Sequence, residues 1–354
     1  MSHRIVFGVV SVVVVAAAGA VGWFGLATTD PAAEAEETVE DYLTAVAAGD
    51  IDTALELAGA TVDLDQETNR FLTGEATAGD WSVVSVAAVD KETTRDGLGD
   101  KEVMVRVDIP EVGQVDTSFV TAWNATKERW WIRDPLMSAV LPRTALTYYD
   151  LNGVIADIPA EPQPEEDGRQ VYQLFPGVYR LYAGASDWVD VDSEPIAVFP
   201  GPSGSSDLAM STPRPVLTEA GEQRAVEAIE ATVTACVTGD SAVEECPGSL
   251  RYGDITVDGV RLESAETSWQ VESMPTMAFE SRHGWVTAVD RESGVAVVTI
   301  DRGAGDPVTA RCEISVADEG IGIGADGEMM VVPPSGGTGW SDPHSISYWS
   351  RCDR

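Results

Sequence analysis

The chain of 354 residues is poor in histidine, cysteine and basic residues, and these shortages exclude whole classes of function. It has three histidines, four cysteines and 22 lysine plus arginine residues, against 59 aspartate plus glutamate residues. The formal net charge of −37 repels the phosphate backbone of nucleic acids, which excludes nucleic-acid binding. A hydrophobic fraction of 44% is high enough for packed cores, so the acidity indicates a folded body with a solvated acidic surface.

The shortage of histidine limits the catalytic chemistry that the chain can support. His283 and His344 both lie in sequences typical of turns, and no G-x-S-x-G nucleophile motif accompanies them. The glycine-rich segment 320–327 lacks the lysine of a phosphate-binding loop and is typical of a hairpin turn. We therefore predict no catalytic residues, no bound cofactor and no enzymatic activity.

The densest group of carboxylates is the obvious candidate for a metal site. Asp187, Asp190, Asp192 and Glu194 lie within eight residues of one another, but they alternate with valines as on a half-exposed strand. The D-x-[DN]-x-[DN]-G pattern of a calcium-binding loop is missing. The sequence thus favours a solvated acidic face, and we predict no metal-binding residues.

A long uncharged run lies near the N-terminus. Residues 5–27 follow the tetrapeptide 1–4, and a helix over Ile5 to Leu26 is long enough to cross a bilayer. Arg4 on the short side and acidic residues on the long side favour a cytoplasmic N-terminus and an extracytoplasmic body. We expect a single-pass cell-membrane protein. A cleaved signal peptide ending near Gly25-Leu26-Ala27 is the alternative.

The four cysteines all lie in the C-terminal third of the chain. The cysteines lack the C-x-x-C spacing that would indicate a zinc site, and in an oxidising compartment they can form disulfides. Of the three connectivities that four cysteines permit, we favour Cys236–Cys246 and Cys312–Cys352.

The first segment after the uncharged run combines two short helices with strands. Asp30 and Pro31 suit the start of a helix that ends at Gly49, and Asp50 suits the cap of a second one. Strand patterns follow over 81–89, 103–107, 118–125 and 129–133.

The run 39–55 and the closing residues Arg129-Trp130-Trp131-Ile132-Arg133-Asp134-Pro135 resemble NTF2-like modules of actinobacterial membrane-anchored proteins. The resemblance implies a cone of curved antiparallel sheet wrapped around helices over residues 32–143. It also implies that an enzyme of this kind would place its base inside the cone, where Asp41 and Tyr42 are the nearest candidates. Tyr42 fits the apolar face of its helix and is expected in the core.

Residues 144–199 form a second unit. Asn152-Gly153 is a strong tight-turn signal, and with Phe175-Pro176-Gly177-Val178-Tyr179 it resembles small PEGA-like β modules. The order of the two modules resembles the extracellular part of TcaA-like envelope proteins, although the zinc ribbon of that family is missing.

Composition marks residues 200–216 as a linker, and residues 217–354 as a C-terminal α+β domain with two disulfides. A helix with Val226, Ile229, Val233 and Val237 on one face precedes further strands, which is compatible with a second NTF2-like module. The predicted fold class is therefore α+β with an N-terminal transmembrane helix.

Three tryptophans are the candidate partner-binding residues: Trp123, Trp130 and Trp131. Strand alternation puts Trp130 on one face and Trp131 on the other, so one is expected in the core and one toward a partner.

These features predict a non-catalytic binding or scaffold protein of the cell envelope, with the membrane, an envelope protein or a cell-wall component as its partners. An NTF2-like enzyme acting on a small molecule and a TcaA-like stress or antibiotic sensor are the alternatives.

Overall fold

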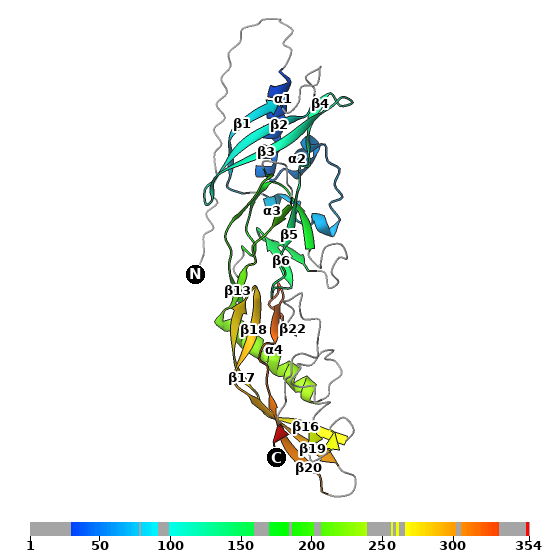
Figure 1. Cartoon of the computed structure of the whole chain (residues 1–354), viewed down its shortest axis with the longest axis vertical. Helices are drawn as coiled ribbons and strands as arrows, with labels where there is room; N and C mark the ends of the chain where they lie inside the picture. Colours follow the sequence, from blue (N-terminus) through cyan, green and yellow to red (C-terminus); the bar gives the residue numbers. More distant parts are fainter. Residues whose placement is uncertain are drawn as a thin grey trace, which may run out of the picture.

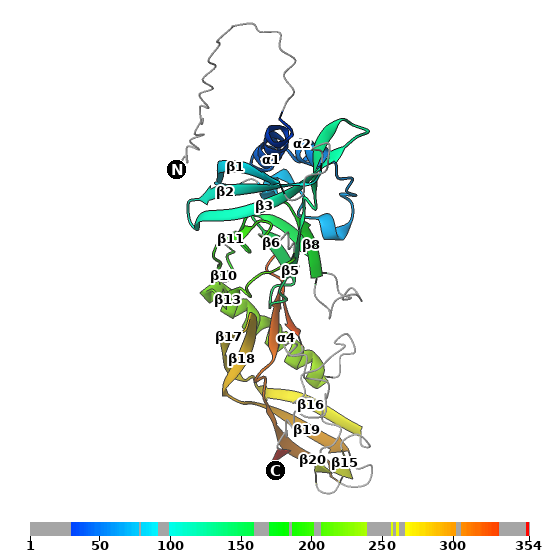
Figure 2. The same ribbon diagram turned by 45° about the horizontal axis from the view of Figure 1, so that its top comes forward.

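The computed structural model describes residues 30–77, 79–90, 99–158, 170–183, 186–201, 207–238, 256–257, 260–261, 266–301, 306–332 and 352–353. These residues form an elongated stack of three units, which follow one another along the molecule in chain order (Figures 1 and 2).

The first unit packs helices on a four-stranded sheet. Helix α1 (Pro31–Ala47) begins with the predicted cap, because Asp30 accepts a hydrogen bond from the backbone N–H of Ala32 at 3.0 Å. Helix α2 (Ile51–Ala58) is likewise capped by Asp50 and ends at Gly59, whose φ of 64° suits glycine. The short helices η1 (Glu67–Asn69) and α3 (Gly74–Thr77) follow.

The sheet is antiparallel in the order β1 (Ser82–Asp90), β2 (Lys101–Ile109), β3 (Gly113–Asn124) and β4 (Arg129–Arg133). Alternate residues of β2 are buried, which places Val103, Val105 and Val107 on the face that α1 covers. All four strands lie where the sequence patterns predicted them.

The second unit consists of short strands. Strand β5 (Met137–Leu141) pairs antiparallel with β8 (Gln170–Leu174) and parallel with β12 (Asp207–Ala209). Three two-stranded ribbons complete the unit: β6 (Tyr148–Leu151) with β7 (Val154–Asp157), β9 (Gly177–Tyr179) with β11 (Ile196–Val198), and β10 (Val189–Asp192) with β13 (Arg214–Leu217).

The third unit packs helix α4 (Glu219–Thr238) against bent strands. Strand β16 (Glu266–Ser273) leads into β17 (Thr276–Arg282), and β18 (Trp285–Glu292) into β19 (Gly294–Asp301). Because β17 pairs with β18 and β16 pairs with β19, the four form one long bent hairpin. A Cβ at Gly294 would lie 2.7 Å from the backbone of Ser273, so the bend requires glycine there.

Further strands widen both halves of this hairpin. Strand β20 (Val308–Ile314) pairs with β19, and β21 (Gly320–Ile323) pairs with β18 and with β22 (Met329–Val332). Strand β23 (Cys352–Asp353) pairs with β20, while β14 (Thr256–Val257) and β15 (Val260–Arg261) form a separate ribbon.

The units share their cores. One cluster of buried residues extends from Phe71 in the first unit through Tyr149 and Tyr172 in the second to Val286 and Ile321 in the third. Backbone hydrogen bonds continue across the same junction, where Ala145 donates to Gly284 and Ile323 donates to Ala145, both at 2.8 Å.

Trp188 forms a tight joint between the second unit and α4. The guanidinium of Arg224 lies 3.7 Å from the centroid of the indole ring and donates to the carbonyl of Gly327 at 3.0 Å. A Cβ at Gly327 would lie 2.1 Å from the indole nitrogen, and one at Gly221 would lie 1.9 Å from the Trp188 carbonyl. Both glycines are needed for this close approach.

Two sequence predictions about fold and location are wrong. The structure is mostly β, not α+β with a transmembrane helix. Within the part of the chain that the structure describes, no helix is long and apolar enough to cross a membrane, since α1 and α4 are both amphipathic and charged on one face. The predicted span 5–27 and the tail 1–4 lie outside the described residues. Single-pass membrane anchoring and the location inferred from it are therefore not supported.

Two local predictions are also corrected. Residues 200–216, which composition marked as a linker, contain β12 and β13, and both pair with strands of the second unit. Gly320–Ile323, predicted as part of a turn, is a fully buried strand. Small residues fit there because a Cβ at Gly322 would already contact β22.

The disulfide between Cys312 and Cys352 is confirmed, and it joins directly paired residues of β20 and β23. Cys236 is also disulfide-bonded, while Cys246, its predicted partner, lies outside the described residues.

Gly221→Ala tests the joint at Trp188. Alanine in a helix is ordinarily more stable than glycine by about 1 kcal/mol. Here the added methyl group collides with a backbone carbonyl, so we expect a loss of about 1–3 kcal/mol in the free energy of unfolding in urea. The neighbouring, exposed Glu222→Ala should change it by less than about 0.5 kcal/mol. A Gly221→Ala protein as stable as the unaltered one would contradict the close contact.

The net charge of −37 predicts that salt stabilises the fold. Raising NaCl from about 0.01 M to about 0.1 M shortens the Debye length from about 30 Å to about 10 Å and weakens repulsion between carboxylates. We expect the thermal midpoint to rise, and to rise equally in NaCl and KCl at equal ionic strength. A flat or falling midpoint would contradict this, and a rise with only one cation would indicate ion binding instead of screening.

Candidate functional site

A small pocket lies where the first and second units meet, and we call it the Arg180 pocket. Its volume is about 200 Å³. Its walls are Gly79 and Asp80 before β1, residues 109–111 at the end of β2, Asn152, residues 178–180 and Pro195.

The Asn152-Gly153 turn between β6 and β7 builds one side of the pocket. Both residues have positive φ, 54° and 90°, which is why asparagine and glycine are favoured here. The Asn152 side chain donates to the carbonyls of Ala76 at 2.8 Å and Val178 at 3.0 Å, and accepts from the backbone N–H of Arg180 at 2.8 Å. One amide thus links α3, the β6–β7 turn and β9.

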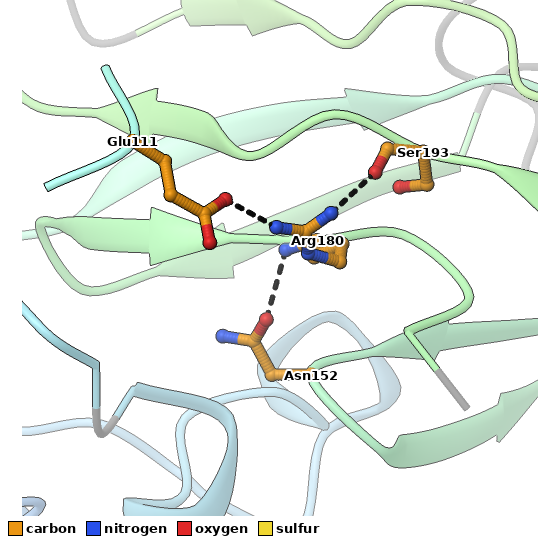
Figure 3. A network of polar contacts seen from close by, with 4 residues as sticks. All are labelled: Glu111, Asn152, Arg180 and Ser193. Carbon is orange, nitrogen blue, oxygen red and sulfur yellow. Dashed lines mark hydrogen bonds and ion pairs between the residues drawn. The ribbon is translucent and has the colours of Figure 1, made fainter. Parts of the chain in front are cut away.

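Arg180 occupies the centre of this network (Figure 3). Its guanidinium donates to the carbonyl of Ser193 at 2.7 Å and to the carboxylate of Glu111 at 2.5 Å. The Arg180 side chain is 37% exposed and that of Glu111 is 63% exposed, so the ion pair is screened by water and contributes at most about 1 kcal/mol. Its main effect is to fix both side chains at the pocket.

The charges of the pocket do not balance. Asp80 is exposed and forms no ion pair with another described residue, whereas Glu111 is paired with Arg180. The pocket is therefore lined by two carboxylates and one guanidinium, together with apolar residues.

The resolved pKa shifts in the described part of the chain do not favour proton transfer near neutral pH. Burial raises the pKa of Tyr149 to about 12 and raises the pKa values of Tyr172, Tyr179 and Tyr182 further. These tyrosines stay protonated, and Tyr179 and Tyr182 donate their hydroxyls in the core to the carbonyls of Phe175 and Tyr148, both at 2.9 Å.

The predicted partner-binding tryptophans separate as the strand alternation indicated. Trp130 is 3% exposed, and its ring meets that of Trp123 edge to face at 5.7 Å between centroids. Trp131 is half-buried on the opposite face of β4, beside Ala122 and Gly59. Trp123 is also half-buried but packs against the core of the first unit, so Trp131 is the candidate anchor on the opposite face of the sheet.

The residues that an NTF2-like enzyme would use are not placed for catalysis. Tyr42 is fully buried, donates its hydroxyl to the carbonyl of Pro135 at 2.5 Å and packs edge to face on Phe119. Burial raises its pKa well above the ordinary value. Asp41, the other candidate, is exposed on the outer side of α1.

The remaining candidates also adopt structural positions. His283 is exposed in the β17–β18 turn with a φ of 51°, and His344 lies outside the described residues. The four acidic residues at 187, 190, 192 and 194 are exposed. No group of three or more potential metal ligands occurs within the described ranges.

The sequence reasoning missed Asp80, Glu111 and Arg180. The Asn-Gly turn and the strand before Arg180 were recognised, but only as local structure. Nothing in the sequence indicated that residues 69 positions apart, Glu111 and Arg180, would form an ion pair.

No protein-family model matches the chain, and no curated protein matches it. Among solved structures, it is similar to an "Ntf2 like protein involved in plasmid conjugation", with 9% identity over 84% of this chain and 94% of that chain. The TM-score of 0.13 is too low for this similarity to support any conclusion.

Asn152→Gly tests whether the amide holds the pocket together. Glycine keeps the positive φ but removes three hydrogen bonds and leaves the Ala76 and Val178 carbonyls without their donor. We expect a loss of about 2–3 kcal/mol in the free energy of unfolding.

The matched control is Asn124→Gly at the end of β3, where the side chain accepts two backbone hydrogen bonds from the exposed β3–β4 turn. It should cost less than about 1 kcal/mol, because water replaces the lost contacts. Equal losses in the two variants would contradict a special role for Asn152.

Proposed function

We propose that the chain is a non-catalytic binding or scaffold protein. The observation that carries this proposal is the filled interior of the first unit, where an NTF2-like enzyme would hold its substrate. Tyr42, Leu43, Val46, Phe119 and Ile132 are all 0–2% exposed in that interior.

The arrangement of the units supports the same proposal. A stack of units with shared cores presents separate surfaces at fixed positions along its length, as a scaffold requires. An envelope protein or a cell-wall component remains the partner class to test first.

The outer face of the first sheet is the surface on which we expect a partner. It carries Trp131 together with Val120 and Ala122 of β3, and charged residues such as Arg133 at the edge. A large aromatic side chain surrounded by smaller apolar groups and a charged rim is a common form of binding anchor.

Site-specific photo-cross-linking in cells that produce the chain tests this role. A photoreactive residue at Arg133, on the same face as Trp131, should give a discrete adduct with one partner. The same group at Val216, which is 54% exposed on β13, is the control and should give none. Trp131→Phe should reduce the adduct at position 133 at least about fivefold, because truncating a central aromatic anchor costs about 1 kcal/mol or more.

Three outcomes would contradict the proposal. They are no adduct at position 133, equal adducts at positions 133 and 216, or conversion of a small molecule by the purified chain.

A further inference from the structure

The Arg180 pocket has the size of a single small metabolite. Drug-sized ligands occupy pockets of about 300–1,000 Å³, and this one measures about 200 Å³. A ligand that fits must therefore be small.

Arg180 retains hydrogen-bonding capacity toward such a ligand. A guanidinium has five N–H donors, and two bonds from Arg180, to Ser193 and Glu111, hold it in place. A fixed guanidinium that is 37% exposed suits a planar carboxylate, which can accept two parallel hydrogen bonds.

The charges around the pocket disfavour an anionic ligand that carries no positive group. Asp80 and Glu111 line the same pocket, and the whole chain carries a net charge of −37, so both the local and the long-range field oppose an isolated carboxylate. A positive group on the same ligand removes this penalty, because it can pair with Asp80 and with the second oxygen of Glu111.

Part of the remaining wall is apolar. Pro110, Val178 and Pro195 contribute aliphatic surface, and Gly79 contributes no side chain. These groups suit a short aliphatic chain.

We infer that the Arg180 pocket binds a small zwitterion of the α-amino acid class. The carboxylate of the ligand pairs with Arg180, its ammonium group pairs with Asp80 and Glu111, and its aliphatic side chain contacts Pro110, Val178 and Pro195. This inference rests on the proposed non-catalytic binding role and adds a ligand class to it.

The position of the pocket gives such a ligand a structural consequence. Asp80 and Glu111 belong to the first unit, and Arg180 belongs to the second. One ligand therefore connects two units and should raise the thermal midpoint of the full chain, since any ligand that binds only the folded state stabilises it.

A matched set of three probes tests the inference by isothermal titration with the full chain. Leucine carries both charged groups, 3-methylbutylamine lacks the carboxylate and 4-methylpentanoate lacks the ammonium group. We expect leucine to bind at least about tenfold more tightly than either analogue, which corresponds to one lost charged contact of about 1.4 kcal/mol. Nuclear magnetic resonance of the recovered leucine should show it unchanged.

Two variants and a control locate the binding. Asp80→Asn removes the negative charge with little change in shape, and Arg180→Lys removes the planar fork while keeping the positive charge. Each should weaken leucine binding at least about fivefold. Asp157→Asn, an exposed carboxylate at the end of β7, should leave binding unchanged. Circular dichroism of all three variants should match that of the unaltered chain, which checks that they fold.

Each other outcome overturns the inference in a defined way. Equal binding of leucine and 3-methylbutylamine would make the pocket a cation site, and equal binding of 4-methylpentanoate would make it an anion site. No leucine binding by the unaltered chain would reject the ligand class but leave the cross-linking result at position 133 unaffected. Conversion of leucine would overturn the proposed non-catalytic function itself.

Discussion

The burial of the second unit between its two neighbours is the constraint on which the rest of the structure depends. Its strands have three to five residues and pair mostly as two-stranded ribbons, which are marginal in water by themselves. Tyr149 and Tyr172 in this unit are nevertheless fully buried. Phe71 of the first unit packs on Tyr172 at 4.9 Å between ring centroids, and Val286 and Ile321 of the third unit join the same cluster. The middle of the molecule therefore folds only as part of the whole.

This dependence explains why the pocket lies at a junction. The interior of the first unit is occupied by its own side chains, and Phe175 of the second unit extends that core. The surfaces of the first and second units do not fit each other completely, which leaves space for a ligand between them. The polar groups at this junction also need hydrogen-bond partners. Asn152 donates hydrogen bonds to two carbonyls of neighbouring segments. It thus both joins the two units and forms part of the pocket wall.

The sequence predicted the parts of the structure that local signals determine. Asp30 and Asp50 marked helix starts because capping involves residues two or three positions apart, and β2 and β4 showed clear alternation. The strands of residues 200–216 were missed because their partners, β5 and β10, are distant and their composition is that of a loop. The transmembrane prediction used the length and lack of charge of residues 5–27 and the charges that flank them, and these residues lie outside the described part of the chain. The Arg180 pocket could not be predicted, because its charged groups come together only through tertiary packing.

The ion pairs that arginines form in this acidic chain affect which ligands can approach the Arg180 pocket. Six of the described arginines form ion pairs within the molecule: Arg106 with Asp116, Arg129 with Glu56, Arg133 with Asp100, Arg180 with Glu111, Arg282 with Glu280 and Arg311 with Glu272. These pairs are exposed and add little stability, but they neutralise the cations locally. The surrounding field thus remains negative and favours the approach of a group with positive charge. In this field a carboxylate approaches Arg180 more readily on a molecule that also carries such a group than as an isolated anion.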